Sequence, residues 1–179
     1  AQGYAAQDYF AVTGVAANDT LNVRSAPDAR APVIGTLAPD ATSIEIVRTE
    51  NGWGMFPAGE SAGWVSMRFL EPIDQPMIGE TRIPNGLRCV GTEPFWYVTL
   101  NVGGVEARSR NWSNDRTYQI TGAARSENSF MTALIMLDNG FAFITPGRCS
   151  DGMSDAEFGW NGYFTLGGSD RTSVLNGCC

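Results

Sequence analysis

The chain has 179 residues, of which 43% are hydrophobic and 17% charged, and its formal net charge at pH 7 is −7. This composition indicates a folded soluble protein, and the length suits one medium domain or two small ones. The twelve basic residues are all arginines scattered along the chain, so we expect no nucleic-acid partner. The longest apolar run, 133–137, is far too short to span a membrane.

Histidine and lysine are both absent from the sequence. Their absence excludes serine–histidine and cysteine–histidine nucleophile pairs, imidazole metal ligands and a lysine Schiff base. Catalysis would have to use carboxylates, tyrosines or thiols. Our prediction is that the protein has no catalytic residue, no metal and no cofactor.

The first residues, "AQGYAAQDYF", contain neither an initiator methionine nor a basic-then-apolar signal segment. An alanine start is typical of a chain that signal peptidase has processed, so we interpret the protein as exported and periplasmic. A shortened chain is the alternative interpretation.

The first half of the sequence consists of short apolar or alternating runs separated by turn residues, which favours β-strands over helices. Alternation of Leu21 with Val23 and of Ile44 with Ile46 gives each strand one buried face. The Asn51-Gly52 pair predicts a hairpin turn. The predicted strands are 10–15, 21–24, 33–37, 43–47, 53–56 and 63–66.

Several spaced blocks of this half resemble a bacterial SH3 (SH3b) domain. They are "LNVRSAP" at 21–27, "VIGTL" at 33–37, the strand "SIEIV" at 43–47, "GW" at 52–53, "GWV" at 63–65 and "FL" at 69–70. The resemblance implies a small barrel that binds peptidoglycan or peptide in a shallow aromatic groove. The implied groove residues are aromatic, although tryptophans of such domains often belong to the core instead: Tyr9, Phe10, Trp53, Phe56, Trp64 and Phe69.

A proline-rich stretch follows, and we interpret residues 73–84 as an extended linker. We place the SH3b-like domain at 9–72 and a second domain at 85–179. The second half again shows strand-like runs, at 95–101, 105–109, 117–121, 130–137, 141–145, 163–166 and 173–176. The predicted fold is therefore all-β, with an SH3-like barrel followed by a second small β-barrel.

The segment 132–145 predicts a hairpin that turns at Asn139-Gly140 and places Met136 opposite Phe143 and Leu137 opposite Ala142. Both faces of this hairpin are apolar, whereas a barrel wall needs only one apolar face. We therefore predict that the outer face is an interface, covered by the SH3b-like domain, the linker or another protein. One face carries Leu134, Met136, Phe141 and Phe143; the other, which we assign to the interface, carries Ala133, Ile135, Leu137, Ala142 and Ile144.

The four cysteines, Cys89, Cys149, Cys178 and Cys179, form an even set in the second half. In an exported protein they predict two disulfides with three possible connectivities. Zinc ligation fits poorly, because the spacing of the cysteines is not that of CxxC pairs.

Three blocks of the second half resemble a family of uncharacterised exported or lipoprotein-borne bacterial domains. They are "GTEPFW" at 91–96, "CSDGMS" at 149–154 and "GC" at 177–178. The family is distantly similar to periplasmic lysozyme inhibitors and META-type domains, and it implies a small β-barrel without an assigned activity. It also implies a pairing of Cys149 with Cys178, after which Cys89 pairs with Cys179.

Three acidic residues are candidates for a ligand site: Glu93, Asp151 and Asp155. A hydrolytic pair needs two carboxylates about 5 to 9.5 Å apart beside a cleft, and the spacing of these residues establishes neither. The alternative is structural, with Ser150, Asp151 and Ser154 satisfying backbone groups in a tight turn beside a disulfide. A cation or ligand site is the remaining possibility.

We interpret the protein as a non-enzymatic periplasmic binding or accessory protein that contacts peptidoglycan or belongs to an envelope protein complex. One alternative is an inhibitor of a cell-wall hydrolase. A second alternative is a carboxylate-based hydrolase.

Overall fold

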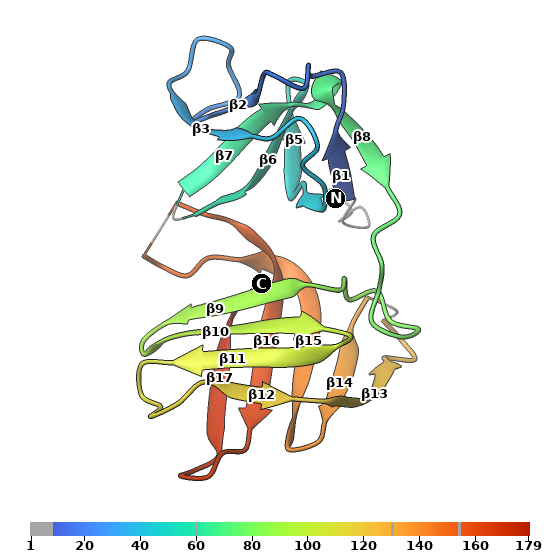
Figure 1. Cartoon of the computed structure of the whole chain (residues 1–179), viewed down its shortest axis with the longest axis vertical. Coiled ribbons are helices and arrows are strands. Elements are labelled where there is room, and N and C mark those ends of the chain that lie inside the picture. Colours follow the sequence, from blue (N-terminus) through green and yellow to red (C-terminus); the bar gives the residue numbers. More distant parts are fainter. Residues whose placement is uncertain (1–8, 60, 130, 154) are drawn as a thin grey trace. The chain divides into compact units, whose positions relative to one another are not determined.

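The computed structural model describes residues 9–59, 61–129, 131–153 and 155–179, and Figure 1 shows its course. It divides into two compact units. The first comprises the chain up to Gln75 and a short segment that ends at Glu157, and the second comprises residues 76–153 and 158–179. Both units are built almost entirely of β-strands, which confirms the predicted fold class.

The first unit contains two antiparallel sheets. The three-stranded sheet has the order β4-β1-β8, and the five-stranded sheet has the order β3-β2-β7-β6-β5. A turn of 3-10 helix, Met67–Phe69, precedes β8. The strands are β1 (Tyr9–Val12), β2 (Leu21–Arg24), β3 (Val33–Leu37), β4 (Ile44–Glu45), β5 (Arg48–Glu50), β6 (Trp53–Ala58), β7 (Ser61–Ser66) and β8 (Leu70–Ile73).

Local sequence explains these strands. In β2 the alternating pattern buries Leu21 and Val23 in the core of the unit and leaves Asn22 exposed. The predicted hairpin turn joins β5 to β6, where Asn51 has φ 51° and Gly52 has φ 79°. Two successive positive φ angles match the twist of the flanking strands, which is why Asn-Gly suits this position.

The second unit is a nine-stranded antiparallel sheet that curls into a nearly closed barrel (Figure 1). Its order is β12-β11-β10-β9-β17-β16-β15-β14-β13, so the last strand pairs with the first strand of the unit. The strands are β9 (Leu87–Thr92), β10 (Phe95–Asn101), β11 (Gly104–Ser109), β12 (Arg116–Tyr118), β13 (Ile120–Arg125), β14 (Ala133–Leu137), β15 (Gly140–Cys149), β16 (Phe158–Leu166) and β17 (Ser173–Cys178).

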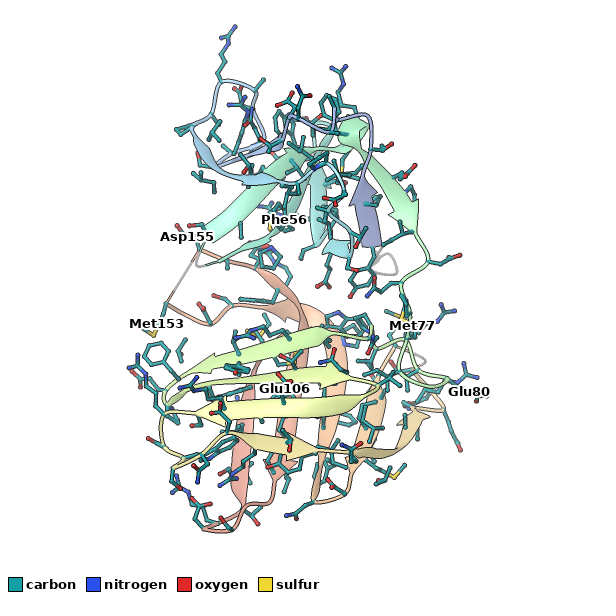
Figure 2. All side chains as sticks on the ribbon, in the orientation of Figure 1. Phe56, Met77, Glu80, Glu106, Met153 and Asp155 are labelled. Atoms are coloured by element: carbon teal, nitrogen blue, oxygen red, sulfur yellow. A yellow bond between two sulfur atoms is a disulfide. The ribbon has the colours of Figure 1, made fainter. Side chains whose placement is uncertain are left out.

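The predicted linker is wrong in its second half. Ile78 and Ile83 are 2% and 0% exposed and belong to the core of the second unit. Between them Thr81 donates to the Ile78 carbonyl at 2.7 Å and accepts from the Ile83 amide at 3.1 Å, which closes a compact turn. Burial of the two isoleucines, rather than the proline content, decides where this segment packs. Figure 2 labels Glu80, an exposed residue of the same turn.

The β14–β15 hairpin forms with a different register from the predicted one. Met136 pairs with Phe141 and Leu137 pairs with Gly140, because the two-residue turn lies at 138–139. The predicted pairing is displaced by two residues, which preserves the face of every side chain. The error is therefore one of register and leaves the two predicted faces intact.

The interface residues, however, were assigned to the wrong face. The five residues of that set line the barrel interior, and each is at most 7% exposed: Ala133, Ile135, Leu137, Ala142 and Ile144. They form the core of their own unit because the barrel closes around them. The outer face is the other one, which carries Leu134, Met136, Phe141 and Phe143.

Two disulfides join the chain end to the rest of the second unit. They are Cys149–Cys178 and Cys89–Cys179, the pairs that the family resemblance implies. Cys89 and Cys179 belong to the barrel core, whereas Cys178 joins the loop that follows β15. Adjacent residues on an extended chain point to opposite faces, so the double cysteine reaches two different neighbours.

Candidate functional site

The candidate site is an open depression of about 300 Å³ in the second unit. It lies where β9, β10, β16 and β17 meet the loop that begins at Cys149. The three sequence blocks of this half therefore converge on one place. Its lining comprises Val90, Gly91, Thr92, Glu93, Trp96, Cys149, Ser150, Asp151, Asn161, Tyr163, Asn176, Gly177 and Cys178.

Trp96 lines the depression from the barrel core, where it is 6% exposed and its indole packs edge-to-face on Phe164 with ring centroids 5.6 Å apart. Two glycines make room for this indole. A Cβ on Gly91 would stand 2.0 Å from Trp96 Nε1, and a Cβ on Gly177 would stand 2.7 Å from Trp96 Cζ2. These glycines are required for close approach, which explains why they stand in the motifs beside Trp96 and Cys178.

One wall consists of polar and aromatic side chains from β16 and β17. Tyr163 is 48% exposed and pairs directly with Asn176 across the two strands. Asn161 lies two residues before Tyr163 and therefore on the same face. Its amide nitrogen donates to the Gly147 carbonyl at 3.4 Å. This wall thus offers two carboxamides beside an accessible phenol ring.

The loop after Cys149 forms a second wall, and it is held by a local hydrogen-bonded turn. The Ser150 hydroxyl accepts from the Gly152 amide at 3.2 Å, and the Asp151 carboxylate accepts from the Met153 amide at 3.0 Å. The structural role predicted for Ser150 and Asp151 is confirmed, while Ser154 lies outside the described residues. Met153 is 64% exposed and projects from this loop (Figure 2).

Of the three predicted acidic ligand residues, the structure brings two together. Glu93 and Asp151 both line the depression, and Thr92 donates to the Asp151 carbonyl at 3.5 Å. Asp155 is not among the lining residues and is grouped with the first unit. It is therefore removed from the candidate site.

Asn161, Tyr163 and Asn176 were missed by sequence reasoning. The signal in the sequence is alternation on β16, where Asn161, Tyr163 and Thr165 alternate with buried residues. The signal becomes specific only with the β16–β17 register, which places Tyr163 opposite Asn176. That pairing follows from the fold and not from the spacing along the chain.

In the first unit, the predicted groove aromatics do not share one face. Phe56 packs against the core cluster, as does Phe69, whose ring lies 5.1 Å from the Arg68 guanidinium carbon. Tyr9 and Phe10 are buried in β1. Phe56 and Phe69 are therefore core residues, and a single groove formed by all the predicted aromatics is incorrect.

Trp53 and Trp64 do share a face. Trp64 pairs with Met55, and Trp53 lies two residues before Met55 on the same strand, so both rings project on the side opposite the buried Val65. The Arg48 guanidinium carbon lies 4.9 Å from the centre of the Trp64 ring. Trp64 is only 4% exposed, whereas Trp53 is half-buried and 47% of the Arg48 side chain is exposed, so the prediction of Trp64 as an accessible groove residue is wrong. We call Arg48, Trp53 and Trp64 the tryptophan face of the first unit.

An apolar surface covers the outside of β14 and β15. Met136, Phe141 and Phe143 are 40%, 42% and 40% exposed. Phe143 pairs with Tyr163, and their ring centroids lie 6.5 Å apart, so this surface adjoins the depression. We call these residues, with Leu134, the apolar strand face.

Arg116, a largely buried charged residue of the same unit, pairs with the exposed carboxylate of Asp170. Arg116 has only 9% of its side chain exposed, and it contacts Asp170 at 2.6 Å and lies 3.9 Å from the centre of the Trp112 ring. The pKa of Asp170 is lowered because its carboxylate accepts hydrogen bonds from the backbone amides of Asp170 and Arg171 and lies beside the Arg116 guanidinium. Burial raises the pKa of Tyr118, whose hydroxyl donates to the Gly167 carbonyl at 2.7 Å.

Within the described ranges, no group of three or more acidic or thiol side chains is arranged to hold a metal ion. None of the helical segments that the structure describes has the length and apolar character needed to cross a bilayer.

Comparison with known protein families identifies the first unit. Residues 19–71 match the family of the bacterial SH3 domain. The chain thus contains a bacterial SH3 domain, which suggests a binding or accessory role. No curated protein and no solved structure matches the chain. The family match ends at residue 71, so the family resemblance of the second half stays a prediction.

Proposed function

We propose that the protein is a non-enzymatic binding protein of the bacterial periplasm whose SH3 domain contacts peptidoglycan. The observation that carries this proposal is the bacterial SH3 domain at residues 19–71. On the tryptophan face, the half-buried Trp53 and the exposed Arg48 are accessible to a ligand. Tryptophan and arginine are residue types that often dominate binding energy.

The proposed location is supported by the two disulfides. Disulfides persist in oxidising compartments such as the periplasm and are rare in the reducing cytosol. Together they use all four cysteines of the sequence. A cytosolic protein of this design would lose both links to reduction.

A binding role fits the acidic residues better than hydrolysis does. The Asp151 carboxylate accepts a backbone hydrogen bond in its own turn, as expected of a structural residue. The chain offers no histidine or lysine to serve as a base. The proposal therefore assigns no reaction to the depression.

Sedimentation with purified peptidoglycan sacculi tests the proposal. We expect the full chain to pellet with sacculi and the Trp53→Ala variant to lose most of that binding. Ile34→Ala is the matched control, because Ile34 is 44% exposed on β3, at the other edge of the sheet from β5. Equal pelleting of wild type and Trp53→Ala, or no pelleting of the wild type, contradicts the proposal.

A second candidate function is a subunit of an envelope protein complex, and the apolar strand face favours it. Contiguous exposed apolar surface on a soluble protein commonly marks a protein interface. The test measures the native mass of the protein in detergent-free envelope extract. We expect the wild type to run at the mass of a complex and the double variant Phe141→Glu/Phe143→Glu to run at the mass of the free chain. Val102→Glu, at a 60% exposed position in the β10–β11 turn, is the control. A native mass equal to that of the free chain in the wild type argues against this candidate.

A further inference from the structure

The accessible ring of Tyr163 gives the depression of the second unit an aromatic platform. Its side chain is 48% exposed, and the Phe143 ring, tilted at 48° to it, supports it from the neighbouring strand. The face of an aromatic ring carries negative potential, so it attracts weakly positive C–H groups. One face of a pyranose ring presents several C–H groups together. The platform therefore suits the flat side of a sugar.

The polar groups around Tyr163 match hydroxyl groups. The carboxamides of Asn161 and Asn176 both donate and accept hydrogen bonds, whereas the carboxylates of Glu93 and Asp151 only accept. A sugar hydroxyl donates one hydrogen bond and accepts others, so it uses both kinds of group. The cross-strand pairing of Tyr163 with Asn176 places a carboxamide beside the ring, where the hydroxyls at the edge of a stacked sugar project.

The charge of the lining selects against anionic ligands. Glu93 and Asp151 are the ionisable side chains of the depression apart from Tyr163, and none of the described residues that line it is basic. A phosphate or carboxylate group would face two carboxylates without a guanidinium to bind it. The arrangement favours an uncharged saccharide.

Size and rigidity also fit a short saccharide. A volume of about 300 Å³ is at the lower end of the range of small-molecule sites. Because the depression is open, it does not have to enclose the whole of a longer saccharide. The disulfide Cys149–Cys178 ties one wall to β17, and a wall held in place before binding loses less freedom when the ligand arrives.

We propose that this depression is a saccharide site that binds one or two rings of a neutral N-acetylhexosamine chain, with Tyr163 as the platform and Asn161, Asn176 and Glu93 as hydrogen-bonding partners. The proposal rests on the proposed function for the natural source of the saccharide, the glycan strand of peptidoglycan. It adds a second contact point to the one assigned to the SH3 domain.

The probe is the β-1,4-linked tetramer of N-acetylglucosamine, titrated into the full chain and followed by heteronuclear NMR. We expect saturable shifts of the amide signals of β16, β17 and the loop after Cys149. Removal of the platform in Tyr163→Ala is expected to weaken binding about tenfold, the equivalent of one lost aromatic contact of about 1.4 kcal/mol. Asn176→Ala is expected to weaken it severalfold.

Matched controls lie on the same sheet outside the depression. Phe141 is 42% exposed on β15 and controls for the loss of an exposed ring, and Val174 is 80% exposed on β17 and controls for Asn176. Phe141→Ala and Val174→Ala are expected to bind the tetramer within twofold of wild type. All four side chains are exposed, so far-UV circular dichroism and the thermal midpoint should stay close to the wild-type values and show that each variant is folded.

The outcomes separate this proposal from the proposed function. No saturable shift at millimolar tetramer overturns the site, and so does an equal loss in Phe141→Ala and Tyr163→Ala. A tetragalacturonate that binds as well as the tetramer overturns the assignment to neutral saccharides. If only the saccharide site is wrong, the tetramer does not bind, but sedimentation with sacculi still depends on Trp53. If only peptidoglycan binding by the SH3 domain is wrong, the Trp53→Ala variant sediments like the wild type, and the tetramer titration is unaffected.

Discussion

Alanine at Gly177 is expected to disrupt the junction where the last strand meets the first strand of the barrel. A Cβ at this position would stand 2.1 Å from the Val90 carbonyl oxygen and 2.7 Å from Trp96 Cζ2. Ordinary contact begins near 3.4 Å, so the backbones must separate by about 3.4 − 2.1 = 1.3 Å. The obstacle is a backbone atom, which cannot move aside as a flexible side chain does.

The magnitude follows from two contributions. Overpacking a closely packed site costs about 1–3 kcal/mol. Separation of β17 from β9 also weakens the pairing of Cys178 with Val90, and a backbone hydrogen bond contributes about 0.5–1.5 kcal/mol. We therefore expect Gly177→Ala to lower the free energy of unfolding by about 3 kcal/mol.

Urea unfolding of the oxidised full chain measures this effect. With an m value of about 2 kcal/mol/M, the midpoint of the second unit's transition should fall by about 1.5 M. The control is Gly103→Ala, since nothing lies within 4 Å of a Cβ there. That variant should match or slightly exceed wild-type stability. A midpoint for Gly177→Ala at the wild-type value, or an equal decrease in both variants, would refute the steric reasoning.

Three further predictions concern the second unit. Serine at both Cys149 and Cys178 should lower its free energy of unfolding by about 3.5 kcal/mol, because the unfolded chain loses a loop constraint of 29 residues; urea unfolding measures it. Because the pKa of Asp170 is lowered, its carboxylate contributes fully to stability at pH values above the ordinary pKa of 3.8. This contribution is lost as the pH falls through the lowered pKa. The difference in thermal midpoint between wild type and Asp170→Asn should therefore be present at pH 6 and vanish at strongly acid pH. Tyr118→Phe should cost about 1–3 kcal/mol, because a buried carbonyl loses its donor, and an unchanged urea midpoint would contradict this.

Much of the fold was predictable because strand alternation and turn chemistry are local. The strand Leu21–Arg24 and the positive φ angles of Asn51 and Gly52 follow from short stretches of sequence. The β14–β15 register was not predictable in this way. Gly140 lies inside β15, where a Cβ would meet the Thr165 carbonyl oxygen at 2.0 Å, so it serves the approach of β16 and not the turn itself.

The burial of Ile78 and Ile83 shows a similar limit. Proline content indicated an extended linker, yet two isoleucines five residues apart supply enough apolar surface to hold the segment against the barrel. The candidate site was predictable to the extent that motifs carry it. Glu93 and Asp151 stand in the motifs, whereas the polar wall depends on a pairing between strands that no spacing along the chain reveals.

The double cysteine at the chain end explains why the site and the core are joined at this place. Cys179 points into the barrel and bonds to Cys89, which fixes the closure of β17 on β9. Cys178 points outward and bonds to Cys149, which fixes the loop that forms one wall of the depression. Since neighbouring residues on a strand face opposite ways, two adjacent thiols are the shortest sequence that holds both. Loss of the inner bond should therefore affect the stability of the barrel, and loss of the outer bond should also affect the shape of the site.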